Sequence, residues 1–533
     1  MQKFRVQRNG TVRALWGAVL LFAFASAAHA GLTDLTQTPN AVNEGITKSL
    51  EQQVGTGRGT LYAPQSSRYI IARDPFRSVR RGRQIFQRKF TMAQGLGPRS
   101  NDGIGDDIHA NATLGAGVSD SCAGCHGRPR GAAGFGGDVF TRPDSRDAPH
   151  LFGLGIQEML GDEMTTDLRA QRARAIAEAR ESGRAVRVRL RSKGVEFGSL
   201  VAQPGGAVDL TGVDGIDRDL RVKPFFAQGG TFNIRQFVVG AFNDEMGLQS
   251  PDPDLLAAAQ GRRVVTPSGM VLDGRVDTLP RPPVRNDNDD ADGDRVANEI
   301  DPALVDHMEF YLLNYFKPAV AEENTFTAIG RRLMNEMGCT SCHRPTLVIE
   351  RDRRVADVET RFDAERGIFN RLFATATPLF HEVDDNRGLP ALRVANGNRF
   401  VVHNIYADLK RHDLGPKFWE RNFDGSYQKE FMTEPLWGVG STAPYGHDGR
   451  SINLHEVILR HGGEAQAARD RYVRFGAASQ LAVREFLQSL IIFPPDDTAS
   501  NLNPGDRNAP NFPQRGHGGI RLPALFLDPT ELE

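Results

Sequence analysis

The chain of 533 residues has few cysteines, few tryptophans and no excess of charge of either sign. It contains 4 Cys, 3 Trp and 65 Lys+Arg against 66 Asp+Glu. Because the charges balance and no run of lysine or arginine occurs, the electrostatic footprint of a nucleic-acid-binding protein is missing. The composition, 39% hydrophobic and 25% charged, is typical of a globular protein of about two or three domains, not of a small disulfide scaffold.

Beyond residue 30 the chain lacks any apolar run long enough to span a bilayer. The first residues combine a basic start, an apolar stretch over residues 14–25 and the small-residue sequence Ala28-His29-Ala30 before Gly31. This pattern predicts a cleaved secretory signal peptide, and a retained N-terminal anchor is the alternative. We therefore expect an exported protein with no transmembrane span in the mature chain.

The four cysteines form two identical clusters, Cys122-Ala-Gly-Cys125-His126 and Cys339-Thr-Ser-Cys342-His343. Cys-x-x-Cys-His is the attachment pattern of c-type haem, in which two thiols on one helical turn bond the vinyl groups and the histidine ligates the iron. Two small disulfide loops, a redox dithiol or one zinc site made from both clusters are the alternatives. Two complete matches with no cysteine left over favour two covalently bound c-type haems.

The segments around the clusters predict a mainly α fold with two cytochrome c-like haem domains in tandem. Residues 326–337 carry apolar side chains at helical spacing and lead directly into Cys339. Residues 303–316 and 481–490 predict a closing helix for each domain. The expected organisation is a signal peptide over residues 1–30, an N-terminal c-type haem domain over 31–317, a C-terminal c-type haem domain over 318–495 and an irregular tail over 496–533.

The first haem domain is expected to be enlarged by loops and a few short strands. A Gly/Asp/Asn-rich segment over residues 95–118 separates the helical pattern at residues 82–86 from the first cluster. From Val186 to Phe226, alternating apolar and basic residues are followed by Gly/Asp-rich turns, which predicts short β-strands.

A helix near the C-terminus carries the predicted sixth ligand of the second haem iron. Asn453 with Glu456 three residues later predicts an N-terminal capping box, and Gly462-Gly463 predicts the helix end. One face of this helix then carries Leu454, Val457, Ile458 and His461. A histidine on an apolar face needs a partner, and we expect iron, with a backbone carbonyl group as the alternative.

His447, in the loop TAPYGHDGR, is the competing ligand for the second iron. Its neighbours favour a turn packed on the haem edge, in which Arg450 pairs with a propionate. For the first iron, His109 and His150 are near in sequence, but neither is placed as well as His461. An open sixth position there would admit peroxide or dioxygen.

An acidic segment matches the spacing of a calcium-binding loop, with Asn in place of the first Asp. Its predicted ligands are Asn288, Asp290, Asp292, Asp294 and Glu299. Asp301 competes with Glu299 as the closing ligand, and a solvated acidic linker is the alternative to a Ca²⁺ site.

Several motifs beyond the clusters resemble one known family. They are LFGLGIQEML at 151–160, FNDEMG at 242–247, YADLKRHDLGP at 406–416, and PLWGVGSTAPYGHDGR with LHEVILRHGGEA within 435–465. They are similar to the di-haem oxidoreductase family of the bacterial di-haem cytochrome c peroxidase superfamily, in which MauG and the rubber oxygenases are more distant. The resemblance implies a periplasmic enzyme with a reactive N-terminal haem, an electron-transfer C-terminal haem, and His461 where peroxidases carry Met.

The resemblance also implies catalytic residues, with two departures. Gln236 and Glu245 are similar to the Gln and Glu that assist proton transfer in the peroxidases, but their separation is one residue short. The tryptophan between the haems has no counterpart, since the tryptophans are Trp16, Trp419 and Trp437. Phe225-Phe226 occupies the expected place of that aromatic residue.

The resulting hypothesis is an exported, peroxidase-like di-haem oxidoreductase. Peroxide, or O₂, would react at the N-terminal haem, with electrons supplied through the C-terminal haem by a small redox protein or a quinone-derived donor. One alternative is a non-enzymatic di-haem electron-transfer cytochrome. The other is an oxygenase or protein-modifying oxidase related to the rubber oxygenases or MauG.

Overall fold

The computed structural model describes residues 49–97, 119–126, 144, 146–282, 284–291, 295–315, 317–321, 323–362, 372–422, 424–491 and 520–521. The predicted signal peptide and His109 lie outside these residues, as does most of the tail from residue 496. In the part described, no helix is both long and apolar enough to cross a membrane.

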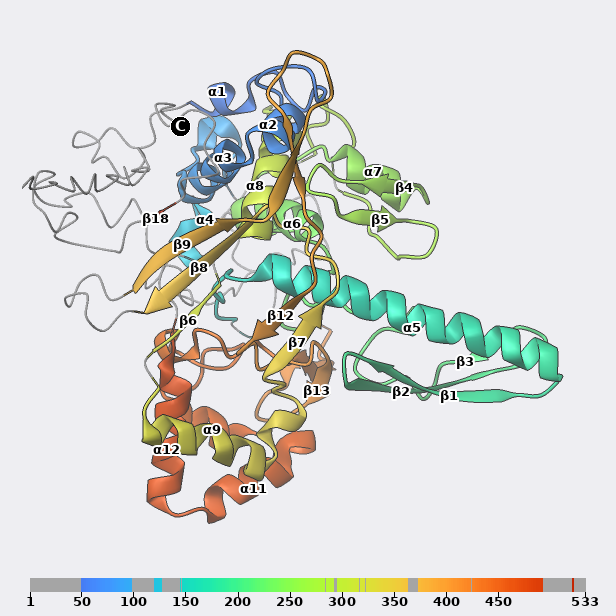
Figure 1. The fold of residues 1–533 in the computed structure, drawn as a ribbon, viewed down its shortest axis with the longest axis vertical. Coiled ribbons are helices and arrows are strands. Elements are labelled where there is room, and N and C mark those ends of the chain that lie inside the picture. The colour runs from blue at the N-terminus through green and yellow to red at the C-terminus, as the bar shows by residue number, and fades with distance from the viewer. Residues whose placement is uncertain are drawn as a thin grey trace, which may run out of the picture.

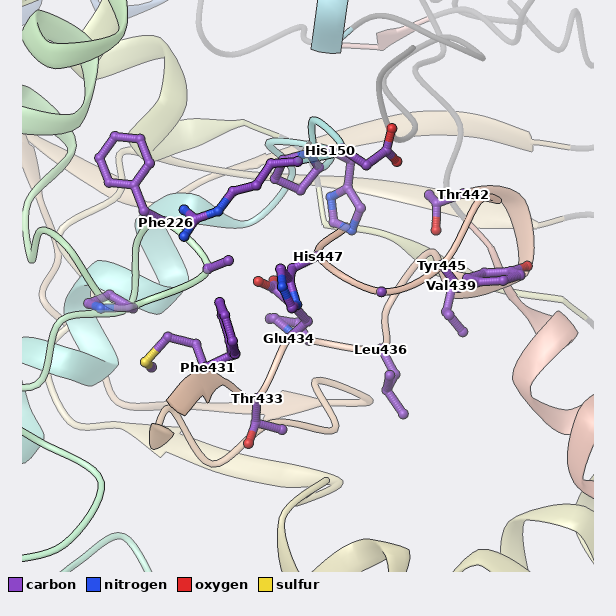
Figure 2. A pocket seen from close by; sticks show the side chains of 18 of the residues that line it. His150, Phe226, Phe431, Thr433, Glu434, Leu436, Val439, Thr442, Tyr445 and His447 are labelled. Atoms are coloured by element: carbon purple, nitrogen blue, oxygen red, sulfur yellow. The ribbon is translucent and has the colours of Figure 1, made fainter. Parts of the chain in front are cut away.

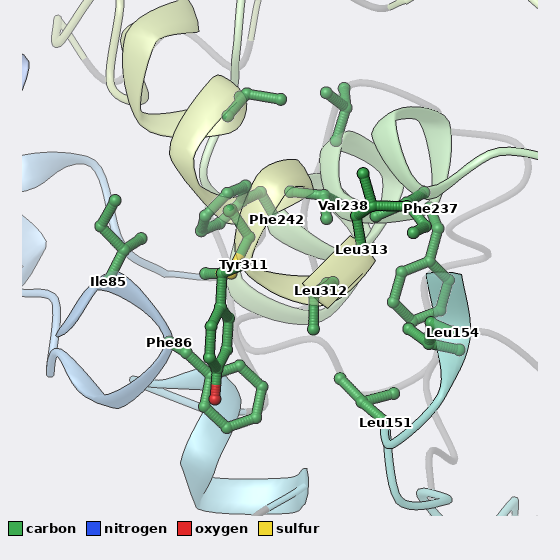
Figure 3. Close-up of a cluster of buried hydrophobic side chains, with 14 of the residues drawn as sticks. Ile85, Phe86, Leu151, Leu154, Phe237, Val238, Phe242, Tyr311, Leu312 and Leu313 are labelled. Carbon is green, nitrogen blue, oxygen red and sulfur yellow. The ribbon is translucent and has the colours of Figure 1, made fainter. Parts of the chain in front are cut away.

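The N-terminal half is a helical body whose elements are α1 (Leu50–Val54), α2 (Ser67–Arg73), α3 (Pro75–Gln87), η2 (Met92–Gln94), α4 (Cys122–His126), α6 (Ile234–Met246), α7 (Pro253–Ala259) and α8 (Pro302–Asn314). Helix α8 is the closing helix predicted for the first domain. It packs so closely on α3 that a side chain at Gly82 would collide with the His307 carbonyl group and Tyr311. Apolar residues of α3, α6 and α8 form the core of this body (Figure 3).

A long helix and a small sheet project from this body. Helix α5 (Leu154–Ser182) carries the antiparallel strands β1 (Val186–Ser192), β2 (Val195–Ala202) and β3 (Val208–Asp209) along its outer part (Figure 1). Leu168 of α5 and Leu190 and Phe197 of the sheet are fully buried in a shared core. The short strands predicted after Val186 are therefore confirmed. The hairpin β4 (Arg263–Val265) and β5 (Val271–Asp273) adds to the same half.

The second cluster lies in a smaller helical body built from α9 (Thr325–Met337), η3 (Cys339–Ser341), η4 (Val439–Ser441), α10 (Leu454–Arg460), η5 (Gly463–Ala465), α11 (Gln466–Arg474) and α12 (Ala477–Ser489). The predicted helices before Cys339 and at the end of this domain are confirmed as α9 and α12. Gly330 lets these two helices touch, because a Cβ there would overlap the Ala482 carbonyl oxygen. Strand β6 (Ala319–Val320) pairs with β17 (Leu490–Ile491) and closes the segment.

Between residues 346 and 432 the chain forms strands that the sequence pattern did not predict. They are β7 (Thr346–Ile349), β8 (Ala356–Phe362), β9 (Leu372–Pro378), β10 (Phe380–Val383), β11 (Leu392–Ala395), β12 (Phe400–His403), β13 (Arg411–Asp413), β14 (Glu420–Arg421), β15 (Tyr427–Gln428) and β16 (Glu430–Met432), with β18 (Ile520–Arg521) against β9. Ala356 packs into the core of the first body, and Ile349 and Val402 pack with residues of α5. The two halves of the chain therefore share hydrophobic cores.

Candidate functional site

One cavity of about 1100 Å³ lies between the two helical bodies. All six residues of the two clusters line it: Cys122, Cys125, His126, Cys339, Cys342 and His343. Pockets for one drug-sized ligand usually enclose about 300–1,000 Å³, so this cavity is larger than a single small ligand needs. Two motifs more than two hundred positions apart in the sequence thus open into one space.

The histidines of the two clusters are held in the same way. His126 Nδ1 lies 2.6 Å from the Pro149 carbonyl oxygen, and His343 Nδ1 lies 2.9 Å from the Tyr406 carbonyl oxygen. An Nδ1–H that donates to a backbone carbonyl fixes the tautomer and leaves Nε2 as a free ligand atom, which is the usual arrangement of metal-binding histidine. Burial lowers the pKa of both imidazoles, which keeps them in the neutral form that binds metal.

The surroundings of the first cysteine of each cluster disfavour a reactive thiolate. Burial raises the pKa of Cys122 to about 12 and that of Cys339 to about 11, whereas reactive dithiols need a lowered pKa. All four cysteines are free of disulfides. Within the described residues, the one group of possible metal ligands that includes a cysteine is Cys342 with Asp408 and His412, and it takes nothing from the first cluster.

The helix predicted to carry His461 is present, and its predicted face is turned to the cavity. Leu454, Val457, Ile458 and His461 all line the cavity. The Asn453 side chain accepts from Glu456 N–H at 2.9 Å and so caps the helix, while the Glu456 carboxylate accepts from Ile452 N–H and not from Asn453. The helix ends at Arg460, with His461 as its C-cap.

His461 has the same support as the two cluster histidines. Its Nδ1 lies 2.7 Å from the Val457 carbonyl oxygen, and the edge of its ring meets Phe418 with centroids 5.3 Å apart. Burial lowers its pKa to about 4, and nearby His343 and Arg460 contribute to this lowering. His455 lies on another face of the helix, where its Nδ1 is 2.8 Å from the Tyr472 hydroxyl group.

His447 also lines the cavity, in a different setting. Its ring stacks on Phe431 with centroids 3.8 Å apart, and its backbone carbonyl accepts from Asp147 N–H at 2.9 Å (Figure 2). Burial lowers its pKa to about 3. Arg450 is not among the residues that line the cavity. Its exposed guanidinium lies 3.6 Å from Asp144 and from Asp448, so nothing in its position favours the propionate contact predicted for it.

Residues 352–490, which include His447, His461 and much of this cavity wall, match the model of the family described as "Di-haem oxidoreductase, putative peroxidase". Over this segment, about a quarter of the chain, the protein resembles the di-haem oxidoreductase family. None of the curated proteins matches it. The residues fit the haems that this family implies, because each cluster offers two cavity-facing thiols and an imidazole with Nε2 free.

The two predicted catalytic residues lie on different sides of α6. Val238, Ala241, Phe242 and Glu245 follow helical spacing and line the cavity. Gln236 is nine positions from Glu245, which places it half a turn away on the helix. Its side-chain oxygen accepts from the Thr231 hydroxyl group at 2.6 Å. The structure therefore brings Glu245 to the cavity and leaves Gln236 outside it.

The aromatic residues between the clusters differ from the sequence-based expectation. Phe226 lines the cavity, and its ring centroid lies 5.1 Å from that of Phe237. Trp437 is buried, lines the same cavity and packs against Gly153 of the first half, although it follows the second cluster in sequence. Its carbonyl oxygen accepts from His150 Nε2 at 3.0 Å.

His150 is unsuited to bind the first iron. Besides the bond from Nε2 to Trp437, its Nδ1 accepts from Phe152 N–H at 3.3 Å. Both ring nitrogens are thus occupied, and ligation would break one of these bonds.

Sequence reasoning missed Arg146 and Glu434, because neither belongs to a recognisable motif. Arg146 is buried, donates to Glu420 at 2.8 and 3.0 Å and also bonds Gln228. The Glu434 carboxyl opens into the cavity near His447 and Phe431 (Figure 2). Desolvation of the carboxyl group raises its pKa to about 7, and the positive charge of Arg146 opposes this rise.

The predicted calcium loop is described only in part. Asp292 and Asp294 lie outside the described residues. Glu299 is buried, and its carboxylate accepts from Gln249 N–H at 2.8 Å, while Asp290 accepts from Arg295 N–H at 2.9 Å and is exposed with Asn288. Asp301 caps α8 through Ala303 N–H. The Ca²⁺ site stays a prediction.

Proposed function

We propose that this protein is a di-haem c-type oxidoreductase that reduces peroxide at the first cluster with electrons delivered through the second. The observation that carries the proposal is the single cavity lined by both Cys-x-x-Cys-His clusters. Bound there, the haems would supply iron for peroxide reduction and for electron transfer. The protein supplies attachment, orientation and protons.

In this proposal the two irons would have different protein ligands. His343 and His461 would both bind the second iron, because each has Nε2 free and Nδ1 bonded to a backbone carbonyl. His126 would bind the first iron, and His150, its nearest rival in sequence, has both nitrogens engaged. A closed second site suits electron transfer, and a first site open to solvent species suits substrate binding.

Peroxide reduction to water consumes two protons, which two cavity carboxyls can provide. Glu245 lies on the face of α6 that lines the cavity. Glu434 holds a proton up to about pH 7. We assign Glu245 the transfer of a proton to the departing oxygen and Glu434 the storage of the next one. Gln236 has no part in this step, because it lies away from the cavity.

The predicted signal peptide supports a proposal for where the enzyme works. We propose export to the periplasm with removal of residues 1–30, and electron supply by a small redox protein or a quinone-derived donor. The loop from Asn288 to Glu299 is proposed to bind Ca²⁺ through the oxygen ligands that this ion prefers.

Intact-mass analysis tests the first part of the proposal. The processed protein should carry two protoporphyrin additions, and Cys122→Ala/Cys125→Ala and Cys339→Ala/Cys342→Ala should each lose one. A native mass without porphyrin would refute the assignment.

Optical spectra of the same protein separate an enzyme from an electron-transfer cytochrome. An enzyme should show a high-spin ferric signal that peroxide alters, in the oxidised or the half-reduced protein. Two low-spin haems indifferent to peroxide in both states would instead support the cytochrome.

A further inference from the structure

Another buried histidine lies in the segment that follows the carbonyl group supporting His343. Tyr406, whose carbonyl oxygen accepts from His343 Nδ1–H, is followed six residues later by His412 on β13. His412 is buried, lines the cavity and has a nitrogen within 4.8 Å of the Cys342 sulfur. It therefore lies beside the attachment point of the second haem.

His412 is bonded to carboxylates through both ring nitrogens. Its Nε2 lies 2.9 Å from Asp408 Oδ2, and its Nδ1 lies 2.7 Å from Glu464 Oε2. Because carboxylates only accept hydrogen bonds, both nitrogens must carry a proton, and the ring is an imidazolium. Burial lowers the pKa of His412, but the hydrogen bond to Asp408 and the charge of that carboxylate raise it above the usual value.

The same bonds tie β13 to the loop that follows His461. Glu464, three residues beyond His461, also accepts from Asp413 N–H at 2.9 Å through Oε1. In the same loop, Gly462 N–H donates to the Leu414 carbonyl oxygen at 3.0 Å. One short segment, residues 406–414, therefore contacts the support of His343 at one end and the loop of His461 at the other.

We infer that His412 is a positioning residue for the second haem. Its hydrogen bonds to Asp408 and Glu464 fix His343 and His461 relative to each other. Its ring also places a positive charge beside Cys342. The inference rests on the proposed attachment of a haem to the second cluster. It adds a residue that ligates nothing and acts through the two imidazoles and through its field.

The positive charge of His412 and its two hydrogen bonds have separable consequences. Reduction adds an electron, so a nearby positive charge raises the reduction potential and a nearby negative charge lowers it. His412→Gln removes the positive charge and one of the two hydrogen bonds to the carboxylates. Glu464→Gln removes a negative charge and keeps an oxygen that can accept from His412. The two variants should therefore shift the second haem's potential in opposite directions.

The experiment uses the holoprotein with both haems attached. His412→Gln should give a more negative midpoint potential for the second haem and altered g-values of its low-spin EPR signal, whereas Glu464→Gln should give a more positive potential. His455→Gln is the matched control, because His455 lies nearby on α10 and bonds the Tyr472 hydroxyl group but is not among the residues that line the cavity. It should leave both readouts unchanged.

Several outcomes would overturn the inference. Unchanged potential and g-values in His412→Gln, with two haems present, would remove the positioning role. Shifts of the same sign in both variants would mean structural damage without a charge effect. Stoichiometric zinc lost only in His412→Gln would make His412 a metal ligand with Cys342 and Asp408. If His412→Gln does not fold, an unchanged potential in Glu464→Gln refutes the charge effect. A native protein without a second haem would contradict the proposed function itself.

Discussion

His126, His343 and His461 share one device, an Nδ1 bonded to a backbone carbonyl oxygen within 2.9 Å. This bond selects the tautomer in which Nε2 carries the free electron pair, so each ring is prepared to bind metal before any metal arrives. His412 and His150, whose two nitrogens are both engaged, lack that free atom. The number of bonded ring nitrogens, more than sequence position, separates ligand candidates from supporting histidines.

His461→Met should raise the midpoint potential of the second haem and change its low-spin spectrum. A thioether stabilises ferrous iron more than an imidazole does. Spectroelectrochemical titration of the holoprotein measures both effects, with His455→Met as control. An unchanged spectrum would assign the ligand role to His447 or to another residue.

Glu434→Gln should stabilise the protein at pH 8 and not at pH 4. The folded protein raises the Glu434 pKa to about 7, above the usual value of roughly 4.3, so it binds this proton more tightly than the unfolded chain. Stability is therefore lost as pH rises from about 4 to 7, and the amide abolishes that loss. Denaturant unfolding at the two pH values tests this.

The surface residue Glu430 provides the matched control for that comparison. It lies four positions earlier on β16 and is exposed, so Glu430→Gln should change stability little at either pH. Equal effects of the two substitutions would show that Glu434 does not hold a proton near neutral pH.

At the scale of elements, helices that carry a strong local pattern were predictable and paired strands were not. The helices before Cys339 and at residues 481–490 follow from apolar spacing and lie within α9 and α12 or overlap them closely. Strands β7 and β12, by contrast, pair across about fifty residues, and neither has the length or alternation to stand out alone. Their partner decides their conformation.

Gly330→Ala should destabilise the second helical body. The added methyl group would overlap the Ala482 carbonyl oxygen and force α9 away from α12, which typically costs about 1–3 kcal/mol. Thermal unfolding measures the loss. Gly476→Ala is the control, because its Cβ would meet no atom within 4 Å. Equal midpoints for the two variants would show that the helices can separate freely.

At the scale of the whole molecule, polar contacts as well as shared cores join the two halves around the cavity. Arg146, after the first cluster, pairs with Glu420 of β14 at 2.8 Å, and both side chains are buried. Arg146→Met would leave the Glu420 carboxylate buried without this partner, which typically costs about 3–5 kcal/mol. Chemical denaturation should show this loss.

The exposed residue Arg450 tests whether burial is the cause. Its side chain is 53% exposed and lies 3.6 Å from its carboxylate neighbours, so Arg450→Met should cost under about 1 kcal/mol. A comparable loss in both variants would contradict the role assigned to the Arg146–Glu420 pair.

Local spacing was enough to predict a haem chemistry for the chain. Thiol attachment and iron ligation would require Cys122, Cys125 and His126 within one turn, and such a requirement is visible in five consecutive residues. The face of α10 that carries His461 was visible for the same reason, since helical periodicity is local. The family match over residues 352–490 includes His461 but neither cluster.

Tertiary contacts decided which of these residues share a space. Only folding shows that both clusters open into one cavity, that Trp437 packs on the first half, and that Gln236 and Glu245 point apart. The hydrogen bond between His412 and Glu464 joins side chains fifty-two positions apart. Such distances depend on packing among many segments at once, and no single segment of the chain carries that information.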